Sequence, residues 1–211
     1  MKPGIALSYT LKGIMGLLFF IGLWKQDWGA AFGCLVGLVI VMIPTFVKRR
    51  YDIALPWVLE LMITLALFIH VSGGVLGLYD AFVRYDTMAH FVSSCLIALL
   101  AFTFIYILHV YWDGLYMDKY AMAFVVVITT MAMGVVWEVY EWVVDMLFGT
   151  TLQLGLWDTM KDLVMDTVGG IIIAIVGVQW IKTGKMDEMT KDLGKAVDEK
   201  IINRDKKEKK K

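Results

Sequence analysis

The segment from Trp137 to Gly170 reads WEVYEWVVDMLFGTTLQLGLWDTMKDLVMDTVGG, and it sets six carboxylates within two apolar runs. Spacings of three and four residues place side chains on one face of a helix. The segment therefore predicts two antiparallel helices that are joined by the loop GTTLQLG, each with an acidic stripe on one face. The carboxylates of the two stripes are Glu138, Glu141, Asp145, Asp158, Asp162 and Asp166.

The composition of the chain is that of a membrane protein. Its 211 residues are 59% hydrophobic and have a mean hydropathy of +0.70, well above the values of soluble globular proteins. A membrane-spanning helix needs about 20 mainly apolar residues, and runs of this length are too long and too uniformly apolar for barrel strands. We therefore expect an all-α fold, a polytopic bundle of six transmembrane helices. The expected spans are 8–24, 29–47, 55–72, 90–110, 120–148 and 163–181.

Basic residues indicate the orientation of these spans. Lys48, Arg49 and Arg50 lie between the second and third spans, and the segment 182–211 carries 11 Lys and Arg. Because cytoplasmic flanks are enriched in Lys and Arg, we expect an inner-membrane protein with both termini in the cytoplasm. We expect a transmembrane domain over 1–181.

The segment 182–211 is the expected cytoplasmic tail. Apolar residues recur in it at spacings of three and four, which is consistent with an amphipathic helix that lies on anionic lipid or self-associates. A solvated, partly disordered extension is the prediction that we favour over such a helix. We expect no nucleic-acid binding from its lysines, since they end a membrane protein, and membrane lipid is the expected partner.

This orientation brings most ionisable residues of the spans to the outer half of the protein. Three helices would then contribute to one polar pocket that opens outward, while Glu60 and His109 lie near the inner ends and look isolated. The expected pocket residues, besides the two acidic stripes, are His70 at the end of the third span and Asp86 and His90, four residues apart, at the start of the fourth.

Two arrangements would stabilise such a pocket. Glu138 lies roughly 15 Å from the outer end of its helix, close to mid-membrane, where an ionised acid needs a partner, water or a proton. A divalent cation is one solution, with Mg²⁺ or Mn²⁺ suited to carboxylates and Zn²⁺ admitted by an imidazole. Protons shared between crowded carboxylates are the other solution. A purely structural network of hydrogen-bonded helix ends and caps, with Asp158 as a helix cap, remains a further alternative.

In the metal hypothesis the residues divide into two groups. The candidate metal ligands are His90, Glu141, Asp145, Asp162 and Asp166. The candidate catalytic residues are His70, Asp86 and Glu138, one of which would act as general base while the ion polarises the substrate or activates water.

Four segments in a fixed order resemble a known family. They are His70 with Gly73 and Gly74, then YDTMAHF (85–91), then EVYEW (138–142), then WDTMKDLVMDTVGG (157–170). This ordered set resembles the YjdF-like family of small polytopic inner-membrane proteins, and a shorter piece around HF is similar to VanZ-like proteins. The resemblance implies a multi-helix membrane protein with a polar outer site, and it implies no particular reaction.

Three functions agree with these features. The first is a metal-dependent membrane enzyme, a hydrolase or transferase, that acts on a lipid-linked or phosphorylated substrate at the outer leaflet. The second is a transporter coupled to protons or cations. The third is an interaction or assembly protein with a structural polar network. We favour the enzyme over the transporter, because the inner half of the spans offers few polar residues and no inverted repeat is apparent.

Overall fold

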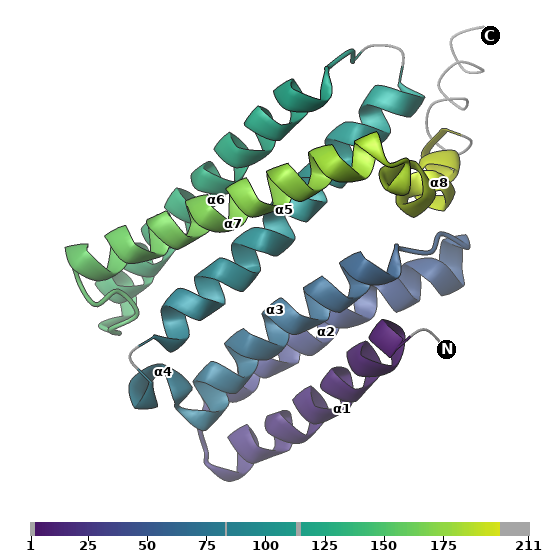
Figure 1. Cartoon of the computed structure of the whole chain (residues 1–211). Helices are drawn as coiled ribbons and strands as arrows, with labels where there is room; N and C mark the ends of the chain where they lie inside the picture. The colour runs from purple at the N-terminus through teal and green to yellow at the C-terminus, as the bar shows by residue number, and fades with distance from the viewer. Residues whose placement is uncertain (1–2, 83, 113–114, 199–211) are drawn as a thin grey trace, which may run out of the picture. The chain divides into compact units, whose positions relative to one another are not determined.

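The computed structural model describes residues 3–82, 84–112 and 115–198. These residues form helices and no strand, which confirms the all-α prediction (Figure 1). The helices are α1 (Pro3–Trp24), α2 (Trp28–Tyr51), α3 (Trp57–Leu76), α4 (Leu78–Ala81), α5 (Tyr85–Tyr111), α6 (Lys119–Phe148), α7 (Leu156–Lys182) and α8 (Lys185–Val197).

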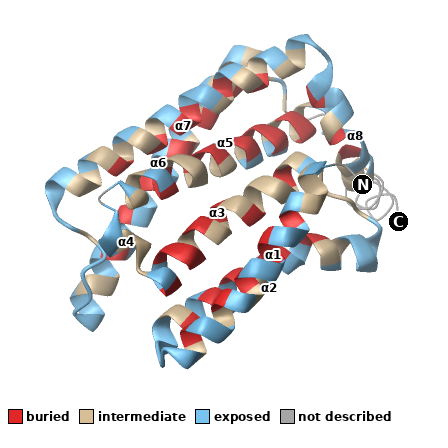
Figure 2. Cartoon of the chain, turned by 60° about the horizontal axis from the view of Figure 1, so that its bottom comes forward, coloured by how far each residue is buried: buried red, intermediate tan, exposed pale blue. Residues whose placement is uncertain are grey.

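Six of these helices are long and apolar enough to cross a membrane: α1, α2, α3, α5, α6 and α7. This confirms the predicted number of spans. Large apolar side chains are exposed along them, for example Phe20, which is 67% exposed, and Phe124, which is also 67% exposed. Figure 2 shows exposed residues alternating with buried ones along α1 and α2. An apolar surface of this extent is suited to contact with lipid.

Two of the spans begin earlier than predicted, at places that matter for the site. α7 begins at Leu156 rather than at residue 163, and α5 begins at Tyr85 rather than at residue 90. Hydropathy places a boundary at the first charged residues, whereas backbone hydrogen bonding continues through them. As a result Asp86 and Asp162 are both helical. Asp158 was expected to cap a helix, but the N-cap of α7 is Gly155, and Asp158 accepts a hydrogen bond from Lys161 at 2.8 Å.

The chain divides into two compact units, residues 1–89 and 90–211. The first unit contains α1 to α4 and the first turn of α5. Gly22 on α1 packs directly on Ala31 of α2, where a Cβ atom would lie 3.3 Å from the Ala31 backbone, so the two helices approach closely. The apolar core of this unit consists of Met15, Leu18, Cys34, Val41, Val71 and Val75.

Polar residues also join α1 to α3. The Lys12 ammonium lies 2.7 Å from a carboxylate oxygen of Glu60, and the Ser8 and Thr64 hydroxyls lie 2.9 Å apart. Lys12 is only 7% exposed, and Ser8 and Thr64 are fully buried. The expectation that Glu60 is isolated was therefore wrong. A lysine within an apolar run is the sequence signal for such a partner, because an unpaired charge at that position would be costly.

The second unit contains most of α5 together with α6, α7 and α8. Its core consists of Ala98, Phe102, Tyr106, Met122, Val126 and Met186. The core thus includes a residue of α8, because Met186 is fully buried and the Tyr106 hydroxyl donates a hydrogen bond of 2.5 Å to Asp187. The first part of the expected tail is therefore a docked helix, while residues 199–211 lie outside the described residues.

The Lys12–Glu60 pair predicts a specific pattern of stabilities. We expect Lys12→Met to lower the free energy of unfolding by about 3 kcal/mol, because it leaves a mostly buried carboxylate without its partner. Replacement of both residues by Met should recover most of that loss, because no unpaired charge remains. Unfolding of the purified protein in detergent measures both effects. A double variant as unstable as Lys12→Met would contradict this role of the pair.

Candidate functional site

His90 is the residue at which three helices of the second unit converge. Its Nδ1 atom lies 3.2 Å from Oδ2 of Asp166 on α7, and its Nε2 atom lies 3.7 Å from Oε1 of Glu138 on α6. All three residues are at most 5% exposed. Glu138 of one predicted acidic stripe and Asp166 of the other therefore both approach His90 of the fourth predicted span.

Small residues allow the helices to approach one another around this imidazole. A Cβ atom on Gly134 of α6 would lie 2.3 Å from Oδ2 of Asp166, the same oxygen that approaches His90. A Cβ atom on Gly169 of α7 would lie 2.2 Å from the Ser94 hydroxyl of α5. Glycine is therefore required at both positions for the observed spacing of α5, α6 and α7.

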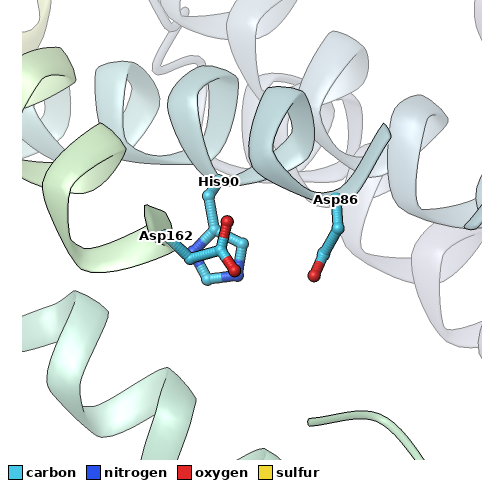
Figure 3. A group of neighbouring side chains, drawn as sticks. All are labelled: Asp86, His90 and Asp162. Atoms are coloured by element: carbon cyan, nitrogen blue, oxygen red, sulfur yellow. The ribbon is translucent and has the colours of Figure 1, made fainter. Parts of the chain in front are cut away.

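Asp86, His90 and Asp162 form the group best placed to hold a metal ion. Each offers one ligand atom, and these atoms all lie within 4.8 Å of one another (Figure 3). Asp86 and His90 lie one turn apart on α5, and Asp162 comes from α7. Two donors of one Mg²⁺ ion lie at most about 4.2 Å apart, two donors of one Ca²⁺ ion at most about 4.8 Å apart, and two donors of a tetrahedral Zn²⁺ ion about 3.4 Å apart. The separations in the group are thus on the scale of metal coordination.

Glu138 supplies a buried acceptor beside this group. Its Oε2 atom accepts a hydrogen bond of 3.4 Å from the Gln153 side chain, while its Oε1 atom has no hydrogen-bond partner among the residues that the structure describes. A buried carboxylate oxygen without such a bond is costly, and such atoms are common where a ligand, ion or proton is to be bound. Gln153 is not among the predicted site residues, because no sequence pattern shows which side-chain amide of a polar loop is directed at a helix.

Glu141 and Asp145, the other predicted ligands of α6, have different surroundings. The indole Nε1 of Trp137 donates a hydrogen bond of 2.8 Å to Glu141, which is 9% exposed. Asp145 accepts three hydrogen bonds from the loop after α6: from the Thr150 hydroxyl and from the amides of Leu152 and Gln153, at 2.6 to 2.9 Å. Asp145 thus orders the loop that carries Gln153, and neither acid belongs to the group of Asp86, His90 and Asp162.

His70 lies in the first unit, near the end of α3. Its Nδ1 atom lies 2.8 Å from the Tyr79 hydroxyl. In the same unit the Tyr85 hydroxyl donates to the Ile69 carbonyl at 2.8 Å and lies 2.9 Å from the Ser72 hydroxyl. These bonds attach the first turn of α5, where Asp86 follows Tyr85, to the end of α3. His70 is thus part of a local network whose neighbours position the start of α5.

Comparison with known proteins gives the family of the chain. Residues 7–183 match the model of the family described as "Predicted membrane protein (DUF2238)". The matched residues span the six long helices and the residues described above. This protein is therefore a multi-pass membrane protein, and it belongs to the DUF2238 family of predicted membrane proteins. Neither the curated proteins nor the solved structures with which it was compared contain a match.

The contact of Gly134 with Asp166 predicts that Gly134→Ala is destabilising. We expect a loss of about 1–3 kcal/mol, the usual cost of inserting a methyl group into a tightly packed region, because Asp166 must move away from His90. Gly33→Ala on α2 is a matched control, since a Cβ atom there would meet nothing within 4 Å, and it should leave stability unchanged or raise it by up to about 1 kcal/mol. Unfolding in detergent compares the two variants. Equal effects would contradict close packing at Gly134.

Proposed function

We propose that this protein is a metal-dependent membrane enzyme, a hydrolase or transferase, that acts on a lipid-linked or phosphorylated substrate at the outer face of the inner membrane. The observation that carries the proposal is the buried convergence of acidic side chains on His90. Half-buried Asp86 joins buried Asp162 there, and their ligand atoms lie within 4.8 Å of each other and of an imidazole nitrogen.

The residues fit a divalent cation in their chemistry and charge. Glu138, Glu141, Asp162 and Asp166 are all at most 9% exposed, and His90 contributes at most a single positive charge. Burial of several like charges is costly unless opposite charge compensates them, and a divalent ion supplies two positive charges at one point. Carboxylate oxygens suit Mg²⁺ and Mn²⁺, and the imidazole nitrogen adds Zn²⁺ to the candidates.

The contacts suggest a role for each residue. Asp86, His90 and Asp162 would hold the ion. Asp166 lies on Nδ1 of His90 and would fix the ring so that Nε2 is the coordinating atom, as carboxylates commonly do behind metal-binding histidines. In this proposal Asp86 becomes a ligand rather than a catalytic residue, and Asp166 becomes an orienting residue.

Glu138 is the proposed general base. Its Oε1 atom lies 3.7 Å from Nε2 of His90, within reach of a water molecule bound beside that nitrogen, and Gln153 holds its other oxygen. A bound divalent ion would polarise a phosphoryl oxygen of the substrate and activate that water. Glu138 would accept the proton of the water as it attacks phosphorus, and it would pass that proton to the departing oxygen as the bond from phosphorus to the leaving group breaks. Asp166 would keep His90 in place during the step.

The location of the site supports a substrate that is carried by lipid. The site residues lie at the start of α5, the end of α6 and the start of α7, ends that share one side if these helices cross the membrane in turn. In this proposal the opposite side faces the cytoplasm, which is supported by the basic residues in the last turn of α2 and in the tail. Trp137, which bonds to Glu141, is itself 40% exposed, so the acidic stripe of α6 continues to a surface that lipid can reach.

The packing below the site favours an enzyme over a transporter. Phe102, Met122 and Val126 are fully buried and form part of the core toward the other end of the second unit. Coupled transport requires a polar route for the ion and the substrate, and these side chains are apolar. We therefore expect purified protein in liposomes to show no uptake driven by a proton or cation gradient, and such uptake would favour the transporter.

The metal proposal predicts how metal content depends on individual acids. Purified protein should retain about one divalent ion per chain, measured by elemental analysis after removal of free metal. Asp162→Asn should abolish this retention, because it removes a proposed ligand, and Asp166→Asn should weaken binding by about 10–100-fold through loss of the contact that orients His90.

Asp145→Asn is the matched control for these variants. This substitution also removes one negative charge from an acidic stripe, but the Asp145 side chain bonds to the loop after α6. The variant protein should therefore retain the ion. Wild-type protein with no stoichiometric metal, and with a thermal stability unaffected by added Mg²⁺, Mn²⁺ or Zn²⁺, would overturn the metal proposal. An assembly role would instead be indicated if truncation after residue 182 abolished function while Asp166→Asn preserved it.

A further inference from the structure

A second potential site lies at the opposite end of the second unit from His90. A cavity of about 570 Å³ is located where the end of α5, the start of α6 and the end of α7 meet. Its volume is within the range of about 300–1,000 Å³ that is typical of small-molecule sites. Apolar and aromatic side chains form most of its lining, among them Tyr106, Val110, Met117, Tyr120, Met122 and Ile181.

Two lysines are held beside one aromatic ring of this cavity. The Lys119 ammonium lies 5.4 Å from the centre of the Tyr120 ring, and the Lys182 ammonium lies 5.7 Å from the same point. Both distances are within the range of cation–π attraction. Lys119 starts α6 and Lys182 ends α7, so two helix ends bring positive charge to the same ring. The arrangement is suited to a single anionic group.

The other polar residues of the cavity are compatible with an anion. His109 accepts a hydrogen bond of 3.3 Å from the Met117 amide at Nδ1, so the proton of a neutral imidazole is on Nε2, which is then a donor. Asp118 carries a negative charge, but this residue is the N-cap of α6. Its Oδ1 atom accepts hydrogen bonds from the backbone amides of Tyr120 and Ala121 at 2.7 and 3.3 Å. This oxygen is therefore directed at the helix end.

Helix α8 fixes the end of α7 that carries Lys182. The chain turns at Gly184, whose φ of 72° is in the left-handed region that favours glycine, and α8 starts at the next residue. Met186 is fully buried, and Asp187 accepts the hydrogen bond of Tyr106, which also lines the cavity. Lys182 is therefore part of a folded corner of the protein.

We propose that this cavity binds one anionic phospholipid of the cytoplasmic leaflet. Its phosphate lies at Lys119 and Lys182, and part of an acyl chain contacts Val110 and Ile181. Basic pockets between transmembrane helices on the cytoplasmic side characteristically bind anionic head groups. The apolar lining next to the charges favours a lipid over a soluble phosphate, because only a lipid has an acyl chain that can pack against this lining. This site is independent of the proposed metal site.

Native mass spectrometry of the full chain, purified in a neutral detergent, tests the proposal. We expect the wild type to retain one phosphatidylglycerol molecule and to bind it at least tenfold more strongly than phosphatidylcholine. The double variant Lys119→Gln/Lys182→Gln should lose at least fivefold of this preference. Lys191→Gln/Lys195→Gln is the matched control, because it removes two exposed lysines from α8 and should keep the preference.

Two further measurements distinguish the source of the effect. Val110→Trp adds bulk to the cavity without changing charge, so it should also reduce retention of phosphatidylglycerol, while Asp162→Asn should not. Inorganic phosphate at millimolar concentration should not displace the lipid, and displacement would indicate a site for soluble phosphate instead. Unchanged preference in Lys119→Gln/Lys182→Gln, or equal loss in the α8 control, would overturn the proposal. If the double variant does not fold, the single variants Lys119→Gln and Lys182→Gln replace it, and each should lower the preference for phosphatidylglycerol.

Discussion

The contact of the His90 imidazole with Asp166 and Glu138 is the interaction on which the second unit depends most. The two acids come from α7 and α6, and each would be costly to bury alone, in lipid or in protein. Contact with a group that can donate a proton or carry a positive charge lowers that cost. The position of His90 on α5 therefore determines which faces of α6 and α7 turn inward. The opposite faces of these two helices, which are apolar, then face lipid.

This interaction joins packing and chemistry in the same residues. Gly134 permits Asp166 to approach His90, and it also sets how closely α6 can approach α7. The core of Phe102, Met122 and Val126 then fills the unit beyond the acids. A stable unit of this kind needs the carboxylates to be compensated, and in the proposed function a divalent cation would supply that compensation. Its binding would remove repulsion among acids that the packing has already brought together.

Spacing within a helix was predictable from the sequence, and contacts between helices were not. The stripes at Glu138 and Asp162 follow from the helical period, and their inward orientation follows from the cost of charge in lipid. The pairing of Lys12 with Glu60 joins residues 48 positions apart, so no local pattern contains it. The bonds of Asp145 to its loop depend on the backbone path after Gly149, and for that reason one acid of a regular stripe has a structural role that its spacing does not reveal.

The two ends of the second unit also constrain the depth of the site. If Gly149 marks the outer boundary of the membrane, Glu138 lies close to mid-membrane. However, α6 has 30 residues, which at about 1.5 Å per residue is longer than a hydrocarbon layer of about 30 Å. If Tyr120 and its two lysines lie at the cytoplasmic interface, Glu138 lies about 27 Å from that interface and thus near the outer one. The same rise separates Lys182 from Asp162 by about 30 Å. The acids would then face the head-group region, where water and a phosphorylated lipid head group can both reach them, and the last turns of α6 would extend beyond it.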